Sequence, residues 1–245
     1  MSEPSRITVC AGPGAAEDFA EAVARRVGVP LSTEAGSGLT LMIDKSGVYL
    51  TNGSLTYKGD FERMLPRVTE GRLSHEMLVH VSKTKTPHPT AIDATAGMGE
   101  DSFLLAAAGY NVTLFEQDPI IAALLKDALR RAKKHPVLRE IAERMQLIEG
   151  DSIELLPRQK QVDLIYLDTM FPARQRSGLI NKKLQLIQSL ERPCPNGEAL
   201  LTAAFCANPQ KIVIKRPLKG EFLGGRQPQY SVKGKAIRYD CFVLR

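Results

Sequence analysis

From about residue 90 onward, short apolar runs alternate with longer stretches of helical periodicity. The predicted strands lie at 91–93, 112–115, 145–148, 164–167 and 212–214, and the predicted helices at 102–108, 120–134, 182–190 and 198–207. A closing hairpin is predicted within 230–244. Strands that alternate with helices are typical of a parallel, doubly wound sheet, so we predict an α/β fold of the Rossmann-like type.

The first seventy residues have a different pattern. Their apolar positions predict a strand at 7–10, an amphipathic helix at 15–27, and a hairpin whose strands at 39–43 and 48–50 flank Lys45-Ser46-Gly47. We therefore predict two domains, a small α/β domain over residues 1–70 and a Rossmann-like domain over residues 71–245. The small domain carries no catalytic group of residues, and we expect it to serve packing or substrate docking.

The composition is that of an ordinary globular protein, with 43% hydrophobic and 24% charged residues in a chain of 245. No apolar run approaches the about 20 residues of a membrane span, and the first residues lack the features of a signal peptide. We therefore expect a cytoplasmic protein with no membrane partner. Four cysteines without a CxxC pair predict buried, reduced thiols and no metal site.

Positive charge is concentrated near the C-terminus. Residues 211–245 contain nine Lys or Arg against two acids, whereas the whole chain carries a net charge of only +6. Binding to a polyanion explains this distribution, and so does a solvated basic surface. Charge by itself does not decide between the two.

A glycine loop follows the strand that ends at Asp93. The segment reads Asp-Ala-Thr-Ala-Gly-Met-Gly-Glu-Asp, and its Gly97 and Gly99 allow a sharp turn and a close approach to a ligand. The third glycine of the dinucleotide-binding GxGxxG pattern is missing. An acid four positions before the first glycine is more typical of class I methyltransferases.

Acidic residues also follow the next two strands. Glu116 ends the second strand, where Rossmann-like sites bind ribose hydroxyls, and its two oxygens can accept from both of them. Asp151 and Ser152 follow the third strand and can bond the adenine amino group. S-adenosylmethionine (AdoMet) carries a sulfonium and an ammonium group, so acids at successive strand ends favour AdoMet over NAD.

The fourth strand ends in Leu-Asp-Thr-Met-Phe-Pro at residues 167–172, close to the [Asp/Asn]-Pro-Pro-[Tyr/Phe] loop of amino methyltransferases. Asp168 can accept the N–H bonds of an exocyclic amine and direct its lone pair at the methyl group. Phe171 can stack on a base lifted out of its helix. The basic residues Arg174, Arg176, Lys215 and Arg216 are predicted to bind RNA phosphates.

Together these motifs resemble the ribosomal RNA small subunit methyltransferase J (RsmJ) family. The resemblance rests on Asp93 to Asp101, Glu116-Gln117, Leu167 to Pro172 and Val213 to Pro217, and it covers roughly Arg72 to Phe242. It implies methyl transfer from AdoMet to the exocyclic N2 of one guanosine in small-subunit (16S) rRNA, free or in the 30S subunit. It also implies cofactor contacts at Glu100, Asp101, Glu116, Gln117, Asp151, Ser152 and Asp168. The family usually has Arg in place of Glu100 and Gln117, and Pro in place of Thr169.

Two other functions are compatible with the sequence. A nicotinamide-dependent oxidoreductase would use the same fold, but we find neither the third glycine nor a hydride-handling pair. A non-catalytic RNA-binding protein would keep the fold and the basic residues without methyl transfer. The sequence does not indicate an oligomeric state.

Overall fold

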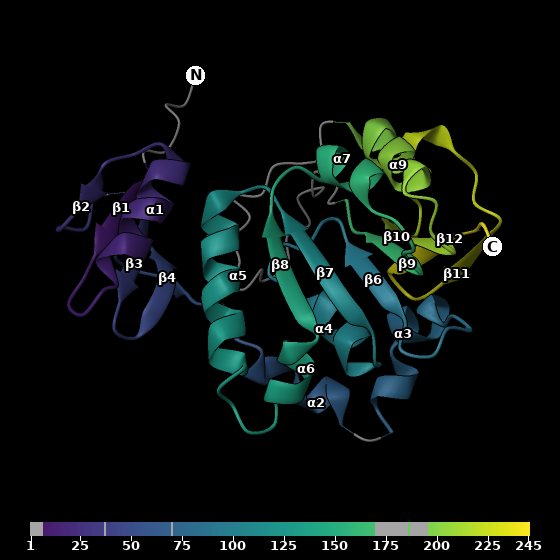
Figure 1. Cartoon of the computed structure of the whole chain (residues 1–245), viewed down its shortest axis with the longest axis horizontal. Helices are drawn as coiled ribbons and strands as arrows, with labels where there is room; N and C mark the ends of the chain where they lie inside the picture. The colour runs from purple at the N-terminus through teal and green to yellow at the C-terminus, as the bar shows by residue number, and fades with distance from the viewer. Residues whose placement is uncertain (1–6, 37, 70, 170–185, 187–195) are drawn as a thin grey trace.

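The computed structural model describes residues 7–36, 38–69, 71–169, 186 and 196–245. Its described strands form two sheets (Figure 1). The first has five strands in the order β2-β1-β3-β4-β5, and the second has seven in the order β11-β12-β10-β9-β6-β7-β8.

The five-stranded sheet is built entirely from the N-terminal part of the chain. Its elements are β1 (Thr8–Ala11), α1 (Glu17–Val27), β2 (Leu31–Ser32), β3 (Thr40–Asp44), β4 (Gly47–Thr51) and β5 (Thr56–Tyr57). The predicted hairpin is confirmed, because β3 and β4 pair antiparallel with Asp44 opposite Gly47. The short strands β2 and β5 were not predicted, because two residues are too few to show a period.

A connecting segment leads from the first sheet to the second. It consists of η1 (Glu62–Met64), α2 (Leu65–Val68), η2 (Leu73–His75) and α3 (Met77–Ser82). Phe61, Met64 and Leu78 are buried in the hydrophobic core of the second sheet. The ring of Phe61 stacks on that of Phe103, with the centroids 5.0 Å apart.

The seven-stranded sheet confirms the predicted Rossmann-like fold. Its elements are β6 (Thr90–Asp93), α4 (Glu100–Ala107), β7 (Asn111–Glu116), α5 (Pro119–Ala132), α6 (Arg139–Glu143), β8 (Met145–Glu149), α7 (Ser152–Leu155), η3 (Leu156–Arg158), β9 (Leu164–Leu167), α9 (Gly197–Cys206), β10 (Lys211–Pro217), η4 (Leu223–Gly225), β11 (Tyr230–Lys233) and β12 (Ile237–Val243). The five strands from β10 to β8 run parallel, whereas β12 and β11 add an antiparallel hairpin at one edge.

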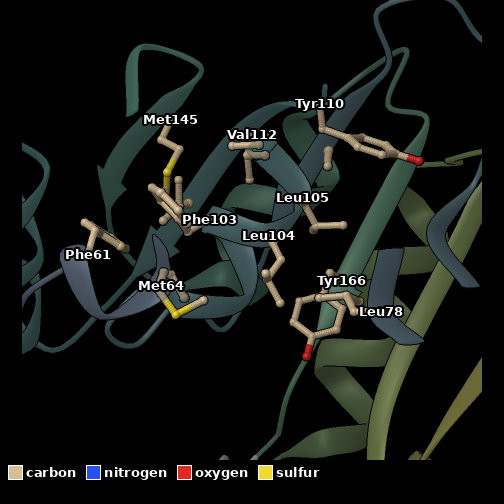
Figure 2. Close-up of a cluster of buried hydrophobic side chains, with 14 of the residues drawn as sticks. Phe61, Met64, Leu78, Phe103, Leu104, Leu105, Tyr110, Val112, Met145 and Tyr166 are labelled. Carbon is tan, nitrogen blue, oxygen red and sulfur yellow. The ribbon is translucent and has the colours of Figure 1, made fainter. Parts of the chain in front are cut away.

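Alternate residues of each strand point to opposite faces of this sheet, and each face has its own core. Leu164 and Tyr166 lie in the cluster formed with α3, α4, α5 and α6, part of which Figure 2 shows. Ile165 and Leu167 lie in the cluster formed with α7 and α9. Because both faces are covered, the central strands are almost continuously apolar.

Helix α5 lies between the two sheets (Figure 1). Its Ile120, Ala123 and Leu124 pack in the core of the five-stranded sheet, whereas Leu125 and Ala128 pack in that of the seven-stranded sheet. This double burial explains why the helix is apolar around most of its circumference.

A buried carboxylate fixes the N-terminal hairpin to α5. Asp127 accepts from Arg130 at 2.7 Å and from Arg131 at 2.8 Å, and its carboxylate also accepts the backbone N–H of Val48. A Cβ at Gly47 would lie 2.6 Å from Asp127 Oδ2, so only glycine allows this approach. Burial works against ionisation, but these hydrogen bonds hold the pKa of Asp127 below its ordinary value.

Some predictions differ from the structure or fall outside it. Cys10 and Cys241 are buried as predicted, but Cys206 is exposed, because it lies on the solvent side of α9 near its C-terminus. Of the predicted helix at 182–190, only Leu186 is described. Within the described residues, no helix is long and apolar enough to cross a membrane, and no cluster of three or more His, Cys, Asp or Glu residues could hold a metal ion.

Candidate functional site

The glycine loop forms where it was predicted, between β6 and α4. Gly97 and Gly99 have φ values of +52° and +75°, in the left-handed region that glycine adopts without strain. A Cβ at Gly99 would lie 2.9 Å from Leu125 Cδ1, whereas one at Gly97 would meet no atom within 4 Å. Gly99 therefore packs the loop against α5, and Gly97 faces open space.

Asp93 lies at the end of β6 with only 1% of its surface exposed. Its Oδ1 accepts from the Thr95 backbone N–H at 3.0 Å, and its Oδ2 accepts from the Ser102 hydroxyl at 2.5 Å. Burial raises the pKa of Asp93 to about 7, and the charges of Asp101 and Asp168 add to the rise. Asp93 thus ties the loop to α4 from inside and contributes negative potential to the site.

Glu116, at the end of β7, joins the glycine loop to the neighbouring strand. Its Oε2 accepts the Gly97 backbone N–H at 2.9 Å, and its Oε1 accepts the Asp118 N–H at 2.8 Å. Burial raises the pKa of Glu116 to about 7 in spite of these two hydrogen bonds. The glycine loop and Glu116, which follow neighbouring strands, are therefore in direct contact.

The other predicted cofactor residues have different surroundings. Asp151 is the N-cap of α7 and accepts the Ile153 N–H at 2.8 Å. The Ser152 hydroxyl donates to the Ala94 carbonyl at 2.6 Å, which links α7 to the loop after β6. Gln117 is exposed next to Glu116. Glu100 is half exposed, and its carboxylate is 3.8 Å from the guanidinium of Arg63.

Asp168 follows β9, and its carboxylate is paired with Lys215 of β10. The Lys215 ammonium lies 2.8 Å from Asp168 Oδ2 and 2.7 Å from Asp101 Oδ2, so it bridges the two acids. The Tyr166 hydroxyl donates to the same Asp101 oxygen at 2.6 Å. The Asp168 backbone N–H donates to Thr95 Oγ1 at 2.6 Å, which joins this group to the glycine loop.

The electrostatics of this cluster follow from burial and from the bridge. Burial raises the pKa of Asp168 above its ordinary value, and Lys215 works against that rise. Burial also opposes the charge on Lys215, but Asp101 and Asp168 together raise its pKa well above the ordinary value. The lysine is therefore charged at neutral pH.

Lys215 and Arg216 point to opposite faces of the sheet, as neighbours on a strand must. Arg216 is buried at 4% exposure, donates through Nε to the Glu221 carbonyl at 2.9 Å, and donates to Thr169 Oγ1 at 3.2 Å. Burial, with the nearby charge of Arg238, lowers the pKa of Arg216 to about 10. The hydroxyl of Thr169 thus accepts a hydrogen bond from Arg216 that a side chain without a polar atom could not.

From the predicted set, the structure brings together six residues: Asp93, Gly97, Asp101, Glu116, Asp168 and Lys215. Phe171, Arg174 and Arg176 lie outside the described residues. Neither Thr95 nor Tyr166 was predicted as a site residue. Tyr166 lies in the apolar strand β9, and nothing in that pattern indicated that its hydroxyl donates to Asp101. The position of Thr95 within the Asp-Ala-Thr-Ala motif was the available signal.

The residues of the site fit AdoMet. The carboxylates of Asp93, Asp101, Glu116 and Asp168 suit a ligand that carries a sulfonium and an ammonium. A carboxylate has about four lone-pair sites, so Glu116 can accept two ribose hydroxyls in addition to its two backbone donors. The open space beside Gly97 leaves room for the ligand.

Comparisons with known proteins agree with this geometry. Residues 26–244 match the family described as "Putative SAM-dependent methyltransferase". The chain is 35% identical to ribosomal RNA small subunit methyltransferase J of Thioalkalivibrio sulfidiphilus over 94% of this chain and 95% of that protein. It is also 35% identical to the protein of that name from Pseudomonas aeruginosa PAO1, over 92% and 91% of the two chains. The crystal structure of a SAM-dependent methyltransferase from Neisseria gonorrhoeae is similar, with a TM-score of 0.76 and 29% identity over 97% of this chain and 96% of that one.

A mostly parallel sheet with a glycine loop after β6 and acids at successive strand ends defines a class I AdoMet-dependent methyltransferase. The cofactor is AdoMet, and the nicotinamide alternative is set aside. Within this class, the chain belongs to the ribosomal RNA small subunit methyltransferase J family.

Proposed function

We propose that this protein transfers the methyl group of AdoMet to the exocyclic N2 of one guanosine in small-subunit (16S) rRNA, in the cytoplasm. The observation that carries the proposal is the place of Asp168 directly after β9, where its backbone N–H donates to Thr95 Oγ1 of the glycine loop and its carboxylate pairs with Lys215. Family membership supports RNA as the substrate, because relatives are named for the small-subunit RNA that they methylate.

Each part of the site has a task in this reaction. Glu116 and the loop at Gly97 would hold the ribose, and Asp151 and Ser152 would lie at the adenine. When bound, AdoMet supplies the methyl group. Asp168 would accept from the guanine amine and direct its lone pair, which needs close and aligned approach. The surplus proton of the amine would pass to water, because no histidine stands within residues 93–101 or 167–172.

Basic residues shortly after Asp168 in the sequence support an RNA substrate. We expect Arg174 and Arg176, which follow residues 167–172 in the sequence, to contact phosphates. We expect Phe171 to stack on the target base. Lys215 and Arg216 were also expected to contact phosphates. The bridge of Lys215 to two acids and the burial of the Arg216 guanidinium instead favour contacts within the protein. The N-terminal sheet, docked on α5, would extend the surface available to RNA.

The test is methyl transfer from labelled AdoMet to small-subunit rRNA that lacks the modification, supplied both as free RNA and as 30S subunits. Digestion to nucleosides followed by mass spectrometry should yield N2-methylguanosine from one of the two substrates. Methyl transfer to another base or another nitrogen would contradict the proposed target. No transfer to either substrate, with AdoMet bound normally, would favour a non-catalytic RNA-binding protein.

Asp168→Ala tests the proposed acceptor. This variant should lose methyl transfer while AdoMet binding is retained or weakened, because Asp168 is proposed to act on the amine. Glu154→Ala removes an exposed acid of α7 outside the described contacts of the site and is the control, with activity expected to be unchanged. Full activity in Asp168→Ala would contradict the role given to this residue.

A further inference from the structure

The Asp168 carboxylate is held on one side only. Its Oδ2 lies 2.8 Å from the Lys215 ammonium, whereas among the described residues no donor bonds to Oδ1. The exposed fraction of the side chain is 30%, so a ligand can reach the carboxylate. Oδ2 is thus anchored, whereas Oδ1 accepts no hydrogen bond from the described residues.

Lys215 is itself held in place by Asp101 and Tyr166. Lys215 also lies 2.7 Å from Asp101 Oδ2, and that oxygen accepts from the Tyr166 hydroxyl at 2.6 Å. Tyr166 is completely buried, and burial raises its pKa well above the ordinary value, so the hydroxyl keeps its proton and its place. Asp101 is therefore fixed from β9, and it fixes the ammonium in turn.

The strand pattern explains why Lys215 can do this. On β10, Val213 faces the core shared with α4, and residue 215 points to the same face two positions later. Asp101 is the second residue of α4, so its carboxylate lies where the lysine emerges from the strand.

We propose that Lys215 is a positioning residue, which holds Asp168 by Oδ2 through the bridge to Asp101 and so presents Oδ1 to the substrate amine. This inference rests on the proposed function for the identity of the amine, but the bridge and its effect on Asp168 do not. The role differs from the phosphate contact that the sequence predicted for Lys215.

The two roles predict different kinetics for Lys215→Met. A positioning role predicts that kcat for methyl transfer falls on the order of tenfold to hundredfold while KM for RNA is unchanged, because a misplaced group costs rate. It also predicts that the acid limb of the kcat profile moves to higher pH, since Asp168 loses the nearby cation. A phosphate contact predicts a raised KM and a salt slope reduced by about 1, with the pH profile unmoved.

Two further variants separate charge from shape. Lys215→Arg keeps the cation and should recover part of kcat, whereas Lys215→Gln keeps a donor without the charge and should keep the shifted pH profile. Lys219→Met removes an exposed lysine of the same basic segment and is the matched control, with kcat and pH profile unchanged.

A titration of Asp168 tests the bridge without relying on activity. Carbon-13 NMR of aspartate-labelled protein, assigned with Asp168→Asn, should show a higher pKa for Asp168 in Lys215→Met than in the wild type. Because this titration needs no RNA, it remains decisive even if methyl transfer to small-subunit rRNA is not found. An Asp168 pKa and a kcat that are both unchanged in folded Lys215→Met or Lys215→Gln would overturn the proposal.

Discussion

Glu116→Gln offers a quantitative test of the cofactor site, because its effect on AdoMet affinity should grow with pH. The pKa of Glu116 in the ligand-free protein is raised to about 7 by burial. Near pH 6 the side chain is mostly protonated and resembles glutamine in charge. Near pH 8 it is mostly ionised and can accept from both ribose hydroxyls with full charge.

The magnitude follows from the pKa. If bound AdoMet requires the ionised form, the association constant scales with the fraction of free protein that is ionised, which rises about tenfold between pH 6 and pH 8. The affinity lost in Glu116→Gln should therefore be about tenfold larger at pH 8 than at pH 6. The amino group of AdoMet also titrates in this range, but it affects both proteins equally and cancels from the ratio.

Isothermal titration calorimetry at pH 6, 7 and 8 gives the required dissociation constants for both proteins. Glu100→Gln is the matched control, since it removes a carboxylate that is 50% exposed at the start of α4, and its effect should not depend on pH. A Glu116→Gln penalty that is the same at pH 6 and pH 8 would refute the reasoning. It would mean that Glu116 is already ionised at pH 6 or does not contact the ligand.

Three substitutions should lower the free energy of unfolding, measured by urea denaturation. Gly99→Ala should cost about 1–2 kcal/mol because its backbone is left-handed, and more because the new Cβ meets Leu125. Calorimetry should also show weaker AdoMet binding. Wild-type values in both assays would contradict this prediction. Phe103→Ala should cost about 3–5 kcal/mol, because the ring is fully buried in the core of Figure 2, and a loss below about 1 kcal/mol would mean that the site collapses without a cavity. Asp240→Ala should cost about 3–5 kcal/mol, since it leaves the guanidinium of Arg238 buried without its carboxylate, and an unchanged stability would show that the three backbone carbonyls bound to Arg238 suffice.

The N-terminal hairpin shows which features the local sequence pattern predicts and which it does not. Its two strands were predicted from alternation and formed, whereas the turn, predicted over residues 45–47, is confined to Lys45 and Ser46 because Gly47 begins β4 opposite Asp44. That Gly47 meets Asp127 of α5 could not be predicted, because the two residues are 80 positions apart and no periodicity links them. The sequence pattern predicts the hairpin, and only the tertiary structure places Gly47 against α5.

The structure confirms the predicted proximity of residues that follow successive strands. Parallel strands of one sheet end at one edge, so acids that follow successive strands must lie near one another. Glu116 and the glycine loop met for this reason, and so did Asp168 and Thr95. The closing hairpin predicted within residues 230–244 is confirmed as β11 and β12, whereas the order of the strands in the sheet comes from the structure alone.

Lys215 and Arg216 mark where prediction from sequence stops. The sequence showed two adjacent basic residues at a strand end, and it identified them as phosphate contacts from their charge alone. Only the tertiary structure decided that the first bridges two acids and that the second is buried against Glu221 and Thr169. The sequence thus determined the fold, because helices and strands follow from local periodicity, and it indicated the cofactor class through the glycines and acids that follow the strands. The partner of each charged side chain depends on residues distant in the chain, and packing alone assigns it.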